Sequence, residues 1–371
     1  MTGKSFGVNV LVLASVFAGS CVKQGPEGDG WTQLGGDVPI TFGTSVTGPA
    51  TRTYTQLSSI CTSFRVFAFY QAGVVSDDPA TRYTGSWEDF RTKQWTPDFM
   101  YNQTVTWSTD HWTYSPVKYW PNNAENTISF WAYAPADATV TLYKSGTNTL
   151  YGNTTPGLPS VMFTVPSTAD CDFMVSRFDM VKNSTENPDY PTYFTQDLSK
   201  PALGDGVNFL FDHALCKVSV QAAKVDPDDK YDIDVNIVSI KDILFTGVKV
   251  EGGWSAGSPD RYDFEVLKDT DANVVLTGSN QTLSSCSILM PQRLNRTVAK
   301  LYVQYRAKNK LASEYTVYDC EALLGDVQSA WEASRQYTIT IRISPGNPIL
   351  FTSEVIPWDS DIQGFFNIND D

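Results

Sequence analysis

Alternation of apolar and polar residues constrains the fold of this chain more than any other feature of its sequence. An apolar residue occupies every second position in 337–343, and the runs 128–134 and 161–165 show a similar period. Successive side chains of a β-strand point to opposite faces, so this period predicts strands with one buried face. Turn-forming clusters of Gly, Pro and Asn separate the runs. The best helical pattern, in 320–336, predicts no more than one or two turns.

The length of the chain predicts two domains. Its 371 residues exceed one typical domain of roughly 100–200 residues. Many short strands joined by turns indicate β-sandwiches, and the polar, proline-containing stretch 183–205 places these domains at 38–195 and 205–371. In the second domain the alternation changes phase before Ala214, which predicts a bulge or kink around Asp212 and His213.

The N-terminus has the features of an export signal. An apolar stretch at 6–17 follows Lys4, and it is shorter than the roughly 20 residues that a transmembrane helix needs. Small residues precede Cys21, and this arrangement resembles the lipobox of bacterial lipoproteins. We therefore expect a lipoprotein signal at 1–20, acylation of Cys21, and a flexible tether at 21–37. The alternative is an ordinary signal peptide with a chance cysteine.

The charge of the chain excludes one class of partner. Acidic residues outnumber Lys and Arg by 41 to 27, and the net charge is −14. Nucleic acid is therefore not an expected partner, because phosphate binding needs concentrated basic residues. Acidity of this kind favours solubility at a cell surface, and with the export signal it predicts localisation at the bacterial cell surface.

Residues that could carry catalysis or hold a cofactor are scarce. The two histidines, His111 and His213, are not accompanied by a GxSxG motif or by metal-ligand spacing. The acidic stretch 226–234 lacks the glycine and the terminal glutamate of an EF-hand loop, so it reads as a turn between strands. No phosphate-binding or dinucleotide fingerprint is present. The sequence thus predicts a protein that is not an enzyme and has no cofactor or metal.

Two groups of residues leave alternatives open. One is the set of cysteines after Cys21, whose odd number prevents complete internal pairing and whose disulfide state is not determined by spacing: Cys61, Cys171, Cys216, Cys286 and Cys320. The other is an aromatic cluster that could bind carbohydrate or pack inside the fold, and that includes Trp107, Trp112 and Trp120. Packing is the preferred interpretation, because several of these rings lie in or beside predicted strands.

Motifs along most of the mature chain resemble one family. The clearest are ISFWAYAP at 128–135 and the aromatic segment 112–121. Further segments agree in order and spacing: 40–42, 64–69, 98–102, 172–175, 209–218, 289–292 and 337–343. Together they resemble the fimbrillin family of Bacteroides-type bacteria, which includes Mfa-like fimbrial subunits and anchor proteins. The resemblance implies two transthyretin-like β-sandwich domains in tandem, a lipoprotein precursor, and a place in fimbriae on the outer membrane.

The resemblance also implies a function and a means of assembly. The expected function is that of a stalk, tip or anchor subunit that joins other subunits by β-strand exchange. In related fimbrillins an arginine-specific protease removes the N-terminal strand, and Arg52 is the closest match here; the alternative is a surface arginine that is not cleaved. The candidate donor strand carries Ile349, Phe351 and Val355 on one face. The preferred alternative is that it pairs within its own domain, because Pro357 interrupts the run. The alternative function is that of a monomeric surface lipoprotein that binds glycans or host ligands through exposed aromatic rings.

Overall fold

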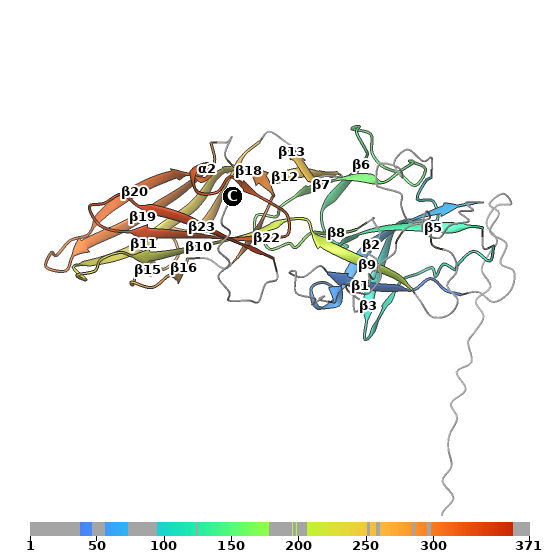
Figure 1. Ribbon diagram of the computed structural model, residues 1–371, viewed down its shortest axis with the longest axis horizontal. Coiled ribbons are helices and arrows are strands. Elements are labelled where there is room, and N and C mark those ends of the chain that lie inside the picture. Colours follow the sequence, from blue (N-terminus) through green and yellow to red (C-terminus); the bar gives the residue numbers. More distant parts are fainter. Residues whose placement is uncertain are drawn as a thin grey trace, which may run out of the picture.

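The chain is all-β, as its alternation predicts. The computed structural model describes residues 38–46, 56–72, 95–123, 125–177, 195, 198, 206–250, 253–256, 260–283, 286–294 and 298–358. In this part of the chain the helical elements are η1 (Leu57–Ser59) and α2 (Leu324–Val327), and α2 lies inside the segment predicted to hold one or two turns. None of the described helices is long and apolar enough to cross a membrane. The molecule is elongated, with β1–β9 toward one end and β19–β20 at the other (Figure 1).

A seven-stranded sheet dominates the end of the molecule that contains the N-terminal strand. Its strands, in spatial order, are β1 (Phe42–Val46), β9 (Val207–His213), β8 (Met174–Ser176), β5 (Thr127–Ala134), β2 (Ser63–Gln71), β3 (Met100–Ser108) and β4 (His111–Thr113). β1 is an edge strand and runs parallel to β9, whereas the other neighbours in this sheet are antiparallel. The first strand of the described chain therefore closes one edge of the sheet.

A four-stranded sheet joins hairpins from the two halves of the sequence. Its order is β13 (Gly253–Ala256), β12 (Thr246–Val250), β7 (Pro159–Thr164) and β6 (Val140–Lys144). β9 and β12 both come after residue 205, yet each pairs with strands from before residue 195. Two sheets thus cross the expected boundary, and the division into 38–195 and 205–371 stays a prediction.

Two further sheets form the other end of the molecule. One contains β16 (Gln281–Thr282), β10 (Cys216–Lys224), β22 (Arg335–Ile343) and β23 (Leu350–Pro357), with β17 (Ser287–Leu289) also on β10. The second contains β14 (Tyr262–Leu267), β11 (Tyr231–Ile243), β19 (Lys300–Asn309) and β20 (Thr316–Leu323), with β15 (Val274–Val275) also on β11. A two-stranded ladder pairs β18 (Gln292–Arg293) with β21 (Ala330–Trp331). β23 and β20 are edge strands.

The seven-stranded sheet has apolar residues buried on both faces. Phe64 and Phe130 belong to one core cluster, and Phe67 and Trp131 belong to another that continues into the far end of the molecule. Every residue of β5 is buried. The strand is in the predicted place, but the expectation of one buried face is wrong for β5, because neighbouring elements cover it on both sides.

At the bulge or kink predicted near His213, the chain passes from one sheet to another. β9 ends at His213 in the seven-stranded sheet, and β10 begins at Cys216 in another. His213 is buried, its Nδ1 lies 3.0 Å from the Oδ1 of Asp172, and its ring stacks on Trp358 at 4.2 Å. Trp358 directly follows β23, so this stack ties the last strand to the junction between the two ends of the molecule.

Candidate assembly site

The N-terminal segment 38–46 is bound to the rest of the fold through its backbone on two sides. On one side β1 pairs with β9, and the amide of Val207 donates to the carbonyl of Thr41 at 2.8 Å. On the other side the amide of Ile40 donates to the carbonyl of Lys118 at 2.9 Å, and the amide of Trp120 donates to the carbonyl of Val38 at 3.0 Å. The segment therefore lies in a slot formed by 118–120 along its first half, 38–40, and by β9 along its second half, 41–46.

Every second side chain of this segment enters the core. The exposed fractions of Ile40, Phe42, Thr44 and Val46 are 1%, 8%, 5% and 0%. The ring of Phe42 meets four other rings at centroid distances between 5.3 and 6.2 Å, those of Phe64, Tyr114, Phe130 and Phe209. Alternation places these residues inward because side chains of a strand have a period of two. The family-like segment at 40–42 contains Ile40 and Phe42 but does not reach Thr44 and Val46.

Two polar side chains, the buried Trp112 and the half-buried Tyr114, recognise the segment. The indole Nε1 of Trp112 donates to Thr44 Oγ1 at 3.0 Å, and the hydroxyl of Tyr114 donates to the carbonyl of Ile40 at 2.9 Å. Burial raises the pKa of Tyr114 to about 12, so this hydroxyl keeps its proton at neutral pH. A strand in this slot is therefore selected by an oxygen at position 44 as well as by apolar side chains.

Glycines allow the strands to approach closely. A Cβ atom on Gly206 would lie 2.7 Å from the backbone carbonyl oxygen of Thr41, so a larger residue there would push the segment out of the slot. A Cβ atom on Gly43 would meet only the side-chain Oδ1 of Asn208, and Asn208 is exposed. Position 43 of the bound strand can therefore accept a side chain if Asn208 rotates away, whereas position 206 cannot.

Removal of segment 38–46 would uncover an apolar groove. Its lining includes Phe64, Trp112, Phe130 and Phe209, all of which are buried in the same core cluster as Phe42. The edge of β9 would lose its hydrogen-bond partner at the same time. A sheet edge beside an apolar groove accepts an extended segment from another chain, because main-chain bonds supply affinity and the pockets select side chains.

The predicted site residues are distributed unevenly over the structure. Cys21 and Arg52 lie outside the described residues. Ile349, Phe351 and Val355 lie in or directly before β23, where they are half-buried against the core and face the same side. β23 pairs antiparallel with β22 of its own chain, so in this structure it is not donated to another subunit. Its role as a donor stays a prediction.

The aromatic cluster serves packing, as the preferred interpretation expected. Trp112 and Trp120 are buried, and Trp107 is half-buried with its ring 5.0 Å from that of Trp112. His111 lies on the surface, and its Nδ1 is 2.7 Å from the carboxylate of the adjacent Asp110. These rings therefore supply the wall of the groove and not an open platform for sugars.

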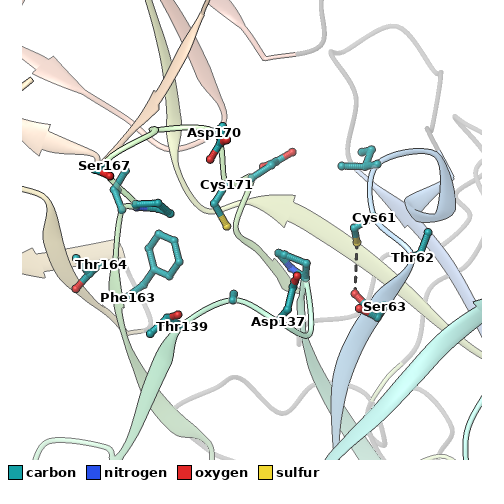
Figure 2. A pocket seen from close by; sticks show the side chains of 16 residues that line it. Cys61, Thr62, Ser63, Asp137, Thr139, Phe163, Thr164, Ser167, Asp170 and Cys171 are labelled. Atoms are coloured by element: carbon teal, nitrogen blue, oxygen red, sulfur yellow. Dashed lines mark hydrogen bonds between the residues drawn. The ribbon is translucent and has the colours of Figure 1, made fainter. Parts of the chain in front are cut away.

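A separate pocket lies near the start of β2. Its volume is about 860 Å³, and it is lined by residues from the loop before β2, the turn between β5 and β6, and the loop after β7. Figure 2 shows the side chains of Cys61 and Cys171 on two sides of this pocket. Burial raises the pKa of both thiols to about 11, so at neutral pH they are protonated and poor nucleophiles. All five cysteines in the described part of the chain are free thiols.

The acidic turn after β10 forms ion pairs with lysine. Asp229 accepts from Lys224 and Lys310, and these partners lower the pKa of its carboxyl group to about 2. Within the described ranges, no group of three His, Cys, Asp or Glu residues is arranged to hold a metal ion. The turn therefore connects strands, as its sequence indicates.

The fold has a counterpart among solved structures. It resembles the crystal structure of a fimbrial protein from Bacteroides vulgatus, with a TM-score of 0.62 and 18% identity over 86% of this chain and 99% of the other. A family model described as fimbrillin-like matches residues 81–358, so the chain belongs to the fimbrillin-like family.

One curated relative matches a large part of the chain. This relative is the fimbrium subunit Fim1C of Phocaeicola vulgatus, which is 26% identical over 280 residues. The match covers 70% of this chain and 64% of Fim1C, so the chain spans less than two thirds of the relative's length. The comparison therefore supports the class, a fimbrial protein. The role of the chain within a fimbria must be inferred from its candidate assembly site.

Proposed function

We propose that this chain is a structural subunit of a surface fimbria and that it joins its neighbours by β-strand exchange in the groove under β1. The observation that carries the proposal is the N-terminal edge strand, whose inward side chains fill an apolar groove made by the rest of the fold. Membership of the fimbrillin-like family supports it. The chemistry is non-covalent: a donor strand restores both the backbone bonds to β9 and the buried side chains.

Processing at Arg52 would open the groove. Arg52 follows the last residue of β1 by six positions, so cleavage after it would detach the segment that fills the slot. We expect the chain recovered from surface filaments to begin at Thr53. Determination of its N-terminal sequence tests this expectation, and a chain that begins at Cys21 in assembled filaments would refute processing.

Lipidation at Cys21 would hold the precursor on the outer membrane. Acylation of a cysteine after a lipobox supplies more than one acyl chain, which stable anchoring requires. The Cys21→Ser variant is expected to lose both palmitate labelling and partition into detergent. Labelling that persists in the variant would rule out this anchor.

The glycan-binding alternative is not favoured by the position of the aromatic rings. Binding to sugars needs exposed ring faces, whereas Trp112 and Trp120 are buried and Trp112 bonds to Thr44. Catalysis is not proposed either: His111 pairs with the adjacent Asp110 on the surface, and the buried His213 contacts Asp172 and Trp358. A structural role in assembly accounts for the burial of Trp112 and Trp120 in the wall of the groove.

A further inference from the structure

Two tryptophans in the wall of the groove have buried indole N–H groups, and segment 38–46 pairs with only one of them. The Nε1 of Trp112 donates to Thr44 Oγ1 at 3.0 Å. The Nε1 of Trp120 is buried and has no hydrogen-bond partner among the described residues. Buried polar groups in native proteins are nearly always paired. The unpaired indole therefore marks a place where segment 38–46 does not match the groove that holds it.

The side chain of Trp120 lies in apolar surroundings. It is only 4% exposed, and it belongs to the core cluster that lines the groove. Its ring meets the ring of Phe130 edge-on, at a centroid distance of 5.9 Å. An N–H group without an acceptor is unfavourable in such surroundings, because it has given up its hydrogen bonds to water and gained none in return. A strand that supplied an acceptor would remove this cost.

Position 38 of the bound segment lies directly opposite Trp120. The antiparallel bridge between Pro39 and Tyr119 fixes this alignment, and the amide of Trp120 donates to the carbonyl of Val38 at 3.0 Å. Since the two bridged residues are exposed, Val38 and Trp120 share the opposite, inward face. Val38 packs against the same core cluster, but its side chain has no hydrogen-bonding group. The residue opposite the unpaired indole is thus one that cannot pair with it.

We infer that Trp120 is a specificity-determining residue of the groove, and that it selects an extended segment of another subunit with a side-chain hydrogen-bond acceptor at the position of Val38. The acceptor is the side-chain oxygen of an amide, a hydroxyl or a carboxyl group. The inference rests on the proposed strand exchange, and it adds the chemistry by which the groove distinguishes an incoming strand from segment 38–46.

The contacts of segment 38–46 define the sequence pattern of the incoming strand. Positions 40, 42 and 46 take apolar side chains, because their present occupants are buried in the core. Position 44 takes an acceptor for the indole of Trp112, as Thr44 does now. Position 38 takes an acceptor for the indole of Trp120. Along the inward face the pattern is therefore acceptor, apolar, apolar, acceptor, apolar at alternate positions.

A strand with this pattern binds the groove more tightly than segment 38–46 does. It keeps the apolar contacts and the bond to Trp112, and it adds one bond to a buried donor. One hydrogen bond of this kind corresponds to a factor of roughly three to ten in an equilibrium constant. The exchange of strands then has a preferred direction, because segment 38–46 holds the groove only until a strand with the acceptor displaces it.

The pairing of position 38 with Trp120 can be tested in the full chain by a double-mutant cycle. Val38→Gln gives the segment an acceptor, and Val38→Leu is the matched apolar control; both are also made together with Trp120→Phe. Urea unfolding measures the four variants. We expect the folding equilibrium constant of the Gln variant, relative to the Leu variant, to be about three- to tenfold higher with Trp120 than with Phe at position 120. The same ratio in both backgrounds would overturn the inference.

Filament yield gives a second readout that does not depend on the folding of Trp120→Phe. Because Val38→Gln strengthens the hold of segment 38–46 on the groove, it should lower the yield of filaments per exported subunit by about three- to tenfold relative to Val38→Leu. Equal yields from the two variants would overturn the selection by Trp120. A complete lack of filaments from the unsubstituted chain would instead overturn the proposed function, and the unfolding cycle would still decide the pairing.

Discussion

A chain that ends at Gly346 is expected to melt at a much lower temperature than the full chain and to be absent from filaments. β23 pairs with β22 through eight residue pairs, and Trp358 after it is only 2% exposed. The ring of Trp358 stacks on His213 at 4.2 Å and lies 4.4 Å from the Nζ of Lys217. Loss of a buried tryptophan alone costs about 3–5 kcal/mol. That is a large part of a total stability of about 5–15 kcal/mol.

A chain that ends at Trp358 is the control for this truncation. It keeps β23 and its stacked tryptophan, so we expect it to melt like the full chain and to enter filaments. Melting followed by circular dichroism and recovery of filaments measure the two effects separately. A chain ending at Gly346 that melts like the full chain would show that β23 does not stabilise its own subunit. If this chain also entered filaments, β23 could not be the donor strand.

The Phe64→Ala variant is expected to lose about 3–5 kcal/mol of unfolding free energy, the usual cost of removing a buried phenylalanine ring. Phe64 is fully buried beneath β1, and its ring lies 4.8 Å from Trp112 and 5.8 Å from Phe209. The cavity would also remove a wall of the groove, so the strand in it should exchange more readily. Urea unfolding gives the free energy.

Thr106→Ala is a suitable control for this variant. Thr106 lies on β3 opposite Ser63, which precedes Phe64, and its side chain is exposed. Exposed substitutions of this kind change stability by no more than about 0.5 kcal/mol. A Phe64→Ala variant as stable as the Thr106→Ala variant would contradict the packing described for the groove.

Local periodicity was sufficient to predict the class of the fold. The alternation in 337–343 coincides with β22, and the short helical pattern contains α2. Such patterns can be recognised in the sequence because residue spacing within one helix or strand determines the face to which each side chain points. The apolar face of the C-terminal strand could be identified in the same way.

Contacts between distant segments could not be predicted from periodicity. The bond from Trp112 to Thr44 joins residues 68 positions apart, and no local pattern relates them. β9 belongs to the first sheet because it pairs with β8 on one side and with β1 on the other, and the phase change before Ala214 does not reveal either pairing. The imidazole of His213 likewise contacts two distant residues, the carboxylate of Asp172 and the ring of Trp358.

The central claim is that each subunit in a filament completes the groove of its neighbour. A reconstruction of surface filaments by electron cryo-microscopy, at a resolution that traces the backbone, tests it most directly. The account predicts that the strand beside β9 is continuous with the neighbouring subunit. Filaments in which residues 38–46 of the same chain fill every groove would contradict it.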